Sequence, residues 1–338
     1  MITSPLYGIV TEQECRTSTQ GKDFLQVMLK TEHGTLKCFI WQTPPDVLTN
    51  DLYPHKGDFI KVESFKDQLK EKSSVVLNLP IDKISKEQYH KEYADIIYRS
   101  GSATPEEIAD AMSVLFDENL FSNKAVSKFV LKCFKRYEAA RIKSTPAATG
   151  NHHMYPGGLL IHTKEVLQTA KAICEVYQKK YPYVNKDVLY CAAIIHDIGK
   201  IDTYFINEHG LAESKYTERA IGHLAIGTWA VQRAWESLTL DEILELGGRR
   251  FFEEVIHCVG THHGSREFGS IQEAQSIEAQ ILSMADLMSA RFGMLDKTIK
   301  DLPKDIDLKE GSTLRLHSDI SFFYSTGIET NRTGNYTK

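Results

Sequence analysis

The chain has 338 residues, of which 42% are hydrophobic and 25% are charged, and its formal net charge at pH 7 is −5. This length is enough for two domains, and the composition is ordinary for a globular protein. The acidic balance argues against a generally basic nucleic-acid coat protein, although it leaves room for a local basic groove.

Neither a membrane segment nor a secretion signal is expected. No apolar run approaches the roughly 20 residues that span a bilayer, and the N-terminal sequence MITSPLYGIV lacks a charged region followed by an apolar one. The six cysteines are scattered without a CxxC pair, which is typical of core thiols in a reducing compartment. We therefore expect a cytoplasmic protein.

The first 90 residues are expected to form β-strands. Apolar residues alternate with other residues in 24–30 and again in 36–41, which is the period of a half-buried strand. Turn sequences occupy 19–22 and 32–34, and further strands are expected near 58–65 and 75–79. Five short strands predict a small barrel, of which the OB-fold is the commonest binder of single strands. An SH3-like barrel is the alternative, and strand counting does not separate the two.

One outward face of this barrel offers contacts for a nucleic acid. Lys37 and Phe39 share that face with Trp41, and single-strand binding uses aromatic stacking as well as charge. We expect Lys37 and Phe39 to contact the substrate, whereas Trp41 is expected to close one end of the barrel. Residues 1–90 carry 11 Lys and Arg against 12 Asp and Glu, which is weak electrostatics for a phosphate-binding domain.

From residue 91 the pattern becomes helical. Thr104-Pro105-Glu106-Glu107 is a capping box, and apolar spacing predicts one amphipathic helix over 122–143 and a last long helix over about 277–297. We expect an α+β multidomain chain, with a five-stranded OB-like barrel at 1–90 followed by an all-α metal-binding domain at 151–300. Residues 91–150 are expected to be a helical linker region packed on that domain, and 301–338 a tail without clear periodicity.

The helical region carries a pattern of histidines and aspartates. His196-Asp197 ends an apolar stretch and precedes Gly199, which can end a helix. Burying an imidazole and a carboxylate together is costly unless something satisfies them, and a metal ion is the usual answer. A lone buried histidine is more often a satisfied core residue, but here several positions reinforce one another. The expected ligands are His162, His196, Asp197, His223, His262, His263 and Asp286.

Local sequence supports these ligands individually. Asp286 has small or apolar neighbours one helical turn away, where an unpaired aspartate would be rare. Gly222 and Gly227 would allow close helix approach at His223. His262 and His263 can both line one site only where a helix ends, and Gly264 is placed to end it. At least one of the pair is a ligand, and the other orients a water or phosphate. His257 is expected to pack.

Imidazole and carboxylate ligands without thiolate suit Mn²⁺, Fe²⁺, Co²⁺, Ni²⁺ or Zn²⁺, and we favour Mn²⁺. Asp197 is the natural bridge between two ions, which at roughly 3.5–4 Å apart hold a hydroxide and clamp a phosphoryl group. Lys200 can neutralise charge in the transition state, although a solvated lysine is the alternative. The turn at Pro156-Gly157-Gly158 feeds a helix N-terminus that attracts phosphate. Tyr155 can stack on a base, and His152 or His153 can touch the phosphate.

The motifs resemble those of a known family. His162, His196-Asp197 and Asp286 resemble the motif of the HD superfamily of metal-dependent phosphohydrolases, which are all-helical. The strings HHMYPGGLLIHT, IIHDIGKI, IGHLAIG and THHG are similar to one branch, the bacterial 3′–5′ exoribonucleases of the YhaM type, which carry an OB-fold ahead of the HD domain. RTSTQGKDFLQVMLKTEHGTLKCFIW resembles OB strands two and three of that family. The resemblance covers most of 5–298, and Ser289 stands where the family often has a second acidic residue.

The resemblance implies an exonuclease that hydrolyses single-stranded RNA, with single-stranded DNA as a further candidate substrate, to nucleoside 5′-monophosphates. The alternative is an HD phosphohydrolase acting on nucleotides or cyclic dinucleotides, with the barrel as a regulatory or assembly module. A non-enzymatic binding module is disfavoured because every ligand position is filled. Homo-oligomer formation is left open.

Overall fold

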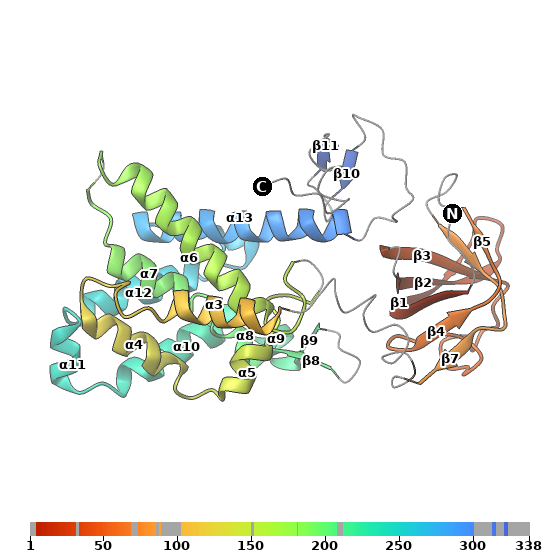
Figure 1. The fold of residues 1–338 in the computed structure, drawn as a ribbon, viewed down its shortest axis with the longest axis horizontal. Coiled ribbons are helices and arrows are strands. Elements are labelled where there is room, and N and C mark those ends of the chain that lie inside the picture. Colours follow the sequence, from red (N-terminus) through yellow and green to blue (C-terminus); the bar gives the residue numbers. More distant parts are fainter. Residues whose placement is uncertain are drawn as a thin grey trace. The chain divides into compact units, whose positions relative to one another are not determined.

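The structure, a computed structural model, describes residues 5–31, 34–68, 74–85, 88, 103–149, 152–180, 182–207, 212–300, 313–315 and 321–323. Contacts divide the chain into two compact units (Figure 1). One unit comprises residues 1–101 and 294–338, and the other comprises residues 102–293. Within the described residues no helix is both long and apolar enough to cross a membrane.

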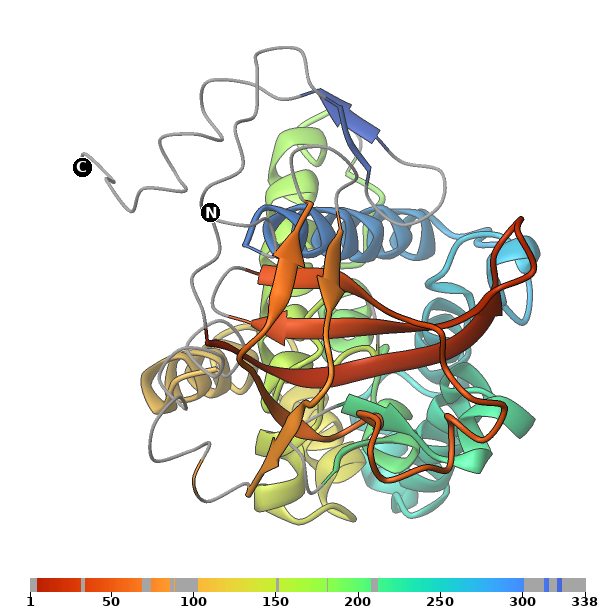
Figure 2. The ribbon, with the colours of Figure 1, turned by 90° about the vertical axis from the view of Figure 1, so that its right-hand side faces the viewer.

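The first unit is built on one curled sheet, whose strands are drawn red to orange in Figure 2. Its seven strands are β1 (Leu6–Thr17), β2 (Asp23–Thr31), β3 (Gly34–Trp41), β4 (Phe59–Val62), β5 (Phe65–Asp67), β6 (Val75–Leu77) and β7 (Asp82–Ile84). They follow the order β5-β6-β3-β2-β1-β4-β7. All neighbours are antiparallel except β3 and β6, which are parallel.

The sheet closes on itself through one bent segment. β4 pairs with β1, and β5 pairs with β6 at the far edge of the sheet, yet only Glu63 and Ser64 separate the two strands. Ser64 accepts a hydrogen bond from the backbone of Asn78, at 3.0 Å, which holds the bend. The expected OB-like barrel is therefore present, but the count of five strands was too low. The bend divides the expected fourth strand in two, and β7 is too short and charged to show an alternating pattern.

The alternation in β2 and β3 places their apolar side chains inside the barrel. Leu25, Val27 and Cys38 are completely buried, while Lys37 and Trp41 on the opposite face are exposed. The turn before β2 forms where expected, with Gly21 at φ +72°, a conformation that favours glycine. Of the second expected turn, residues 32 and 33 lie outside the described residues.

The second unit is helical (Figure 1). Its helices are α3 (Pro105–Leu115), α4 (Lys124–Phe134), α5 (Ala139–Ser144), α6 (Gly158–Tyr177), α7 (Lys186–Ile195), α8 (Lys200–Thr203), α9 (Tyr216–Ala220), α10 (His223–Glu236), α11 (Leu240–Glu245), α12 (Arg249–Thr261), the 3₁₀ turn η2 (Arg266–Phe268) and α13 (Ile277–Lys300), whose last residues belong to the first unit. A hairpin of β8 (Tyr204–Ile206) and β9 (Ala212–Ser214) follows α8. Within the first unit, β10 (Thr313–Arg315) pairs with β11 (Ser321–Phe323).

Helix α7 is the centre of the helical core. Every residue from Val188 to Ile195 is buried, and the helix packs against α4, α6 and α12. A helix that is apolar on all sides is stable only when it is surrounded in this way. Because His196 and Asp197 follow directly, the packing of α7 fixes the position of both side chains inside the unit.

The single helix expected over 122–143 is wrong, because the structure divides it into α4 and α5. Buried Tyr137 lies in the break and donates its hydroxyl to Asp202 at 2.8 Å. This long-range hydrogen bond holds Tyr137 between the two helices. The capping box of α3 is confirmed, since Thr104 and Glu107 exchange both expected hydrogen bonds.

Candidate metal centre

The expected ligands come from five helices of the second unit (Figure 1). His162 lies on α6, His196 and Asp197 follow α7, and His223 is the first residue of α10. His262 and His263 follow α12, and Asp286 lies on α13. The structure brings all seven side chains together.

Gly199 allows α8 and α10 to approach each other. A Cβ atom on Gly199 would lie 2.1 Å from the carbonyl oxygen of His223 and 2.6 Å from the nitrogen of Gly227, so only glycine fits there. Gly222 has a different role from the close approach expected for it. It has no atom within 4 Å of an added Cβ, but its φ of +84° permits the turn that starts α10.

The end of α12 lets both His262 and His263 face the site. The helix ends at Thr261, and Gly264 adopts φ +84° directly after the pair. The sequence-based expectation of a helix end at this position is confirmed. A Cβ on Gly264 would also lie 2.6 Å from the hydroxyl of Ser283. This turn therefore favours glycine both for its positive φ and for the lack of space.

The first ligand set surrounds the Nε2 atom of His162. This nitrogen lies 3.1 Å from Asp286 Oδ1 and 3.3 Å from Asp197 Oδ2. His196 Nε2 lies 3.3 Å from the same Asp197 oxygen. The four donor atoms lie within 4.8 Å of one another, a spacing that one cation can span.

The second ligand set lies on the other side of Asp197. Its remaining oxygen, Oδ1, is 3.5 Å from His223 Nε2 and 3.4 Å from His262 Nε2. His263 belongs to the same group, since the ligand atoms of the three histidines lie within 4.8 Å of one another. Asp197 thus divides its two oxygens between two sets of ligands.

Each histidine is oriented by a partner of its second ring nitrogen. The Nδ1 atoms of His196, His262 and His263 donate to backbone carbonyl oxygens at 2.7–2.9 Å. His223 Nδ1 donates to Glu218 at 2.8 Å. His162 Nδ1 lies 2.9 Å from the hydroxyl of Ser289. These bonds leave the Nε2 lone pairs directed at the centre, which is how metal-ligating histidines are held.

The residues fit a cation, because without one their polar atoms are left unsatisfied. Asp197 Oδ1, His223 Nε2 and His262 Nε2 are buried and have no hydrogen-bond partner. The Nε2 atoms of His162 and His196 lie 3.3 Å apart. Nitrogen and oxygen ligands without a thiolate suit Mn²⁺, Fe²⁺, Co²⁺, Ni²⁺ or Zn²⁺.

Electrostatics put most of these groups in their ligating forms. Burial opposes ionisation of Asp197, but Lys200 and the neighbouring histidines outweigh it and hold the pKa of that carboxyl well below its usual range. Burial lowers the pKa of His196 and His223, and it lowers the pKa of His263 to about 4. These imidazoles are therefore neutral at pH 7. For His162, burial is outweighed by Asp197 and Asp286, which raise its pKa to about 9, and a proton held in this way is displaced when a cation binds.

Lys200 is buried rather than solvated, so the alternative of a solvated lysine is wrong. It is 7% exposed, and its Nζ donates to Asp197 Oδ2 at 2.6 Å. The short helix α8 begins at this residue and turns its side chain back toward the carboxylate. A buried ammonium next to the ligand sets supplies a fixed positive charge.

His152, His153 and Tyr155 lie next to the first ligand set. The rings of His152 and His153 are centred 5.3 Å and 5.7 Å from that of His162, and Tyr155 is 5.9 Å from His153. His153 Nε2 donates to Glu165 at 3.2 Å, while the Nδ1 atoms of His152 and His153 are buried without a partner. His257, by contrast, accepts a hydrogen bond from the backbone of Gln275, as expected for a packing residue.

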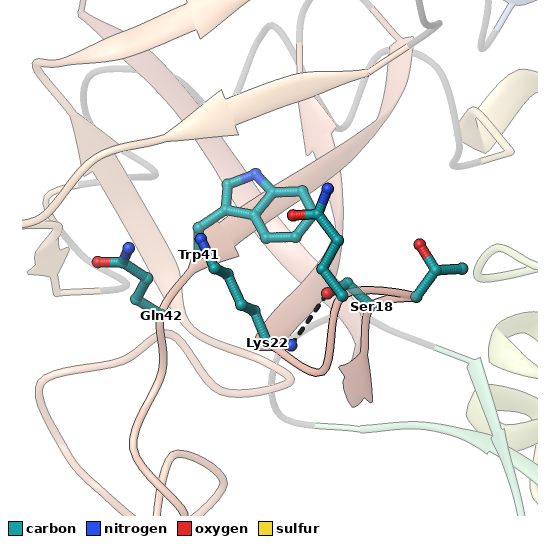
Figure 3. Close-up of a pocket in the computed structure, with 6 residues that line it drawn as sticks. Ser18, Lys22, Trp41 and Gln42 are labelled. Atoms are coloured by element: carbon teal, nitrogen blue, oxygen red, sulfur yellow. Dashed lines mark hydrogen bonds between the residues drawn. The ribbon is translucent and has the colours of Figure 1, made fainter.

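The two barrel residues expected to bind substrate lie in the other unit. Lys37 Nζ lies 5.7 Å above the ring of Phe39, which is 6.1 Å from Trp41. Trp41 does not close the barrel, contrary to expectation, because it is 45% exposed. Figure 3 shows it beside Lys22 and Ser18, in a pocket of about 370 Å³. Its outward position follows from the alternation that buries Ile40.

Three supporting residues could not be identified as such from the sequence. Ser289 donates to Glu165 at 2.6 Å, so its oxygen accepts from His162 Nδ1, and Glu218 orients His223. Glu165 follows His162 by three residues on α6, which places it on the same helix face. The spacing between His162 and Glu165 is the one sequence signal for these supporting residues. Glu218 and Ser289 are recognised only by their positions in space.

Comparison with known proteins matches the helical unit to a known family. The HD domain family model matches residues 159–291, which include all seven expected ligands. A second family model, whose description names a helicase, matches residues 101–180. No solved structure was found to match the chain.

The relatives resemble the chain over most of its length. The 3′-5′ exoribonuclease YhaM of Listeria welshimeri is 29% identical over 307 residues, which cover 88% of each chain. The proteins of the same name from Listeria innocua and Listeria monocytogenes are each 28% identical, again over 88% of each chain. The chain is therefore similar to the YhaM proteins over most of its length, and the part that matches the HD domain model follows an OB-like barrel.

Proposed function

We propose that the chain is a metal-dependent 3′–5′ exonuclease that hydrolyses single-stranded RNA to nucleoside 5′-monophosphates. The observation that carries the proposal is the position of Asp197, whose two oxygens face two separate sets of ligands. Two metal ions roughly 3.5–4 Å apart can clamp a phosphodiester, and a carboxylate with one oxygen toward each set is suited to bridge them. The names of the YhaM relatives supply the substrate and the direction.

Two divalent cations fit these ligands, and we favour Mn²⁺. The first would be held by His162, His196, Asp197 and Asp286, and the second by Asp197, His223 and His262, with His263 as a further ligand. Bound there, such cations would supply Lewis acidity to the scissile phosphate and lower the pKa of a water molecule.

The chain's own residues position the substrate and its charge. Lys200 fixes Asp197 and adds a positive charge for the developing phosphorane. His153 donates its Nε2 hydrogen to Glu165 and lies beside His162, where His152 or His153 can touch the scissile phosphate. His263 is neutral and can orient a water or a phosphate oxygen, and Tyr155 can stack on a base.

The barrel would hold the strand through Lys37 and Phe39 on its aromatic face. Stacking tolerates any sequence because every base has a π-face, so single-stranded DNA is a further substrate to test. We place the protein in the cytoplasm, because its six cysteines are all free thiols. Self-association into a homo-oligomer is a separate question for sedimentation.

The test is a time course on single-stranded RNA labelled at its 5′ end. We expect a ladder that shortens from the 3′ end with Mn²⁺ and is absent with EDTA or in Asp197→Ala. Asp51→Asn, an exposed carboxylate of the barrel unit, is the matched control and should retain activity. Intact RNA in every lane, from protein that still binds Mn²⁺, would contradict the proposal. Nucleotides and cyclic dinucleotides would then be the substrates to try. A barrel with little net charge would favour this alternative, in which the barrel does not bind a nucleic acid.

A further inference from the structure

One pocket of the helical unit lies between α4 and α10. It has a volume of about 570 Å³ and is lined by Lys132, Cys133, Lys135, Arg136, Ala230, Arg233, Ala234 and Ser237. Pockets of roughly 300–1,000 Å³ accommodate small ligands. None of these residues contributes to the metal centre.

The pocket carries more positive than negative charge. Lys132 is paired with Glu242 at 3.1 Å, and Arg136 with Asp202 at 3.5 Å. Lys135 and Arg233 have no carboxylate partner among the described residues, and both are exposed. Two unpaired cations in one pocket of an acidic chain create a local attraction for an anion.

An exposed tryptophan adjoins these cations. Trp229 is 51% exposed, and the guanidinium groups of Arg136 and Arg233 lie 5.8 Å and 5.1 Å from its ring centroid. The two cation–π contacts hold the indole in place. A fixed, exposed indole offers a surface on which a base can stack.

From this combination we infer that the pocket between α4 and α10 binds a nucleoside phosphate. Lys135 and Arg233 receive the phosphate, because they are the cations without a carboxylate partner. Trp229 receives the base. The ligand is either a free nucleotide or a nucleotide of a bound strand, and both present the same chemistry. The inference does not depend on the proposed nuclease activity.

The binding of AMP to the full-length protein in EDTA tests this inference by calorimetry, since EDTA removes cations from the metal centre. We expect Arg233→Ala to weaken AMP binding by at least about ten-fold, the loss expected for charge-assisted hydrogen bonds. Arg250→Ala is the matched control, because Arg250 is an exposed arginine on α12 whose partner is Glu254, and it should bind AMP as the unaltered protein does. Trp229→Ala should weaken binding of AMP but leave that of inorganic phosphate unchanged.

A ten-nucleotide RNA in EDTA distinguishes the two sources of the ligand. If Arg233→Ala weakens AMP binding alone, the ligand is a free nucleotide, and if it also weakens RNA binding, the ligand is a nucleotide of the strand. Equal affinities of Arg233→Ala and the unaltered protein for both ligands would overturn the inference. So would AMP binding that is lost in Asp197→Asn and kept in Arg233→Ala, because AMP would then occupy the metal centre.

Discussion

At the scale of single residues, the metal centre depends on side chains that do not face it. Ser289 accepts a hydrogen bond from His162 and donates one to Glu165, which in turn accepts from His153. The serine therefore connects a ligand of the first set to a ring that lies beside the substrate position. An apolar residue at 289 would leave His162 Nδ1 buried without an acceptor.

We expect Ser289→Ala to weaken Mn²⁺ binding by about 10–100-fold, the usual effect of losing a hydrogen bond behind a ligand. The measurement is a calorimetric titration of metal-free protein. Ser289→Thr keeps a hydroxyl at this position and should restore most of the affinity. Unchanged Mn²⁺ affinity in Ser289→Ala would mean that packing alone orients His162.

The clustering of the expected ligands could be predicted from the sequence, because burial of His196 and Asp197 at the end of an apolar helix needs a compensating charge. The same reasoning could not find Glu218, because its contact with His223 is evident only once α9 and α10 are placed in space. The expectation that Trp41 closes the barrel was wrong for a related reason. The presence of a large aromatic residue does not show whether its face of the strand is covered by other residues.

At the scale of elements, the site depends on how closely α8 approaches α10. Gly199 and Gly227 meet at this crossing, but they are not equivalent. A Cβ on Gly199 would collide with backbone atoms, whereas a Cβ on Gly227 would meet its nearest atom, the nitrogen of Gly199, at 3.4 Å. Backbone cannot move aside as a flexible side chain can.

Gly199→Ala should therefore lower the free energy of unfolding by about 1–3 kcal/mol or more, as overpacking does, and should weaken Mn²⁺ binding by displacing Asp197. Gly227→Ala is the matched control, and it should be neutral or gain up to about 1 kcal/mol from the better helix propensity of alanine. Urea denaturation of both variants measures the difference. Equal stabilities would show that α8 can shift at no cost.

The helix end at His262 was predicted correctly because Gly264, at φ +84°, marks it locally. Helix α7 also ends next to His196, but Gly199 keeps a helical φ of −63° and serves the close approach to α10 instead. The break between α4 and α5 was not predicted, because the contact made there, the hydrogen bond from Tyr137 to Asp202, joins residues 65 positions apart in the chain. The bend at Glu63 and Ser64, between β4 and β5, was not predicted for a similar reason. β4 pairs with β1 and β5 pairs with β6, and these pairings depend on strands distant in the sequence.

At the scale of the whole molecule, metal ligands and barrel belong to different compact units. All seven ligands lie in residues 102–293, and the described strands β1 to β7 lie in residues 1–101. A cation that binds only the folded helical unit stabilises that unit and leaves the barrel's own free energy of unfolding unchanged.

Differential scanning calorimetry should accordingly show two transitions, of which Mn²⁺ raises one. At a thousand-fold excess over its dissociation constant a ligand adds about 4 kcal/mol, which for a unit of this size is roughly 8–16 °C. Asp197→Ala should remove the Mn²⁺-dependent shift and leave the other transition in place. A single transition that moves as a whole with Mn²⁺ would show that the two units unfold together.

The division of Asp197 between two sets of expected ligands also predicts the stoichiometry of metal per chain. Because each set is incomplete without one of its oxygens, Asp197→Ala should reduce the metal content from about two ions to about none. Removing His223 affects only the second set, so His223→Ala should retain about one ion. The number of ions lost thus reports how many sets a residue serves, and plasma emission spectrometry of dialysed protein would count them.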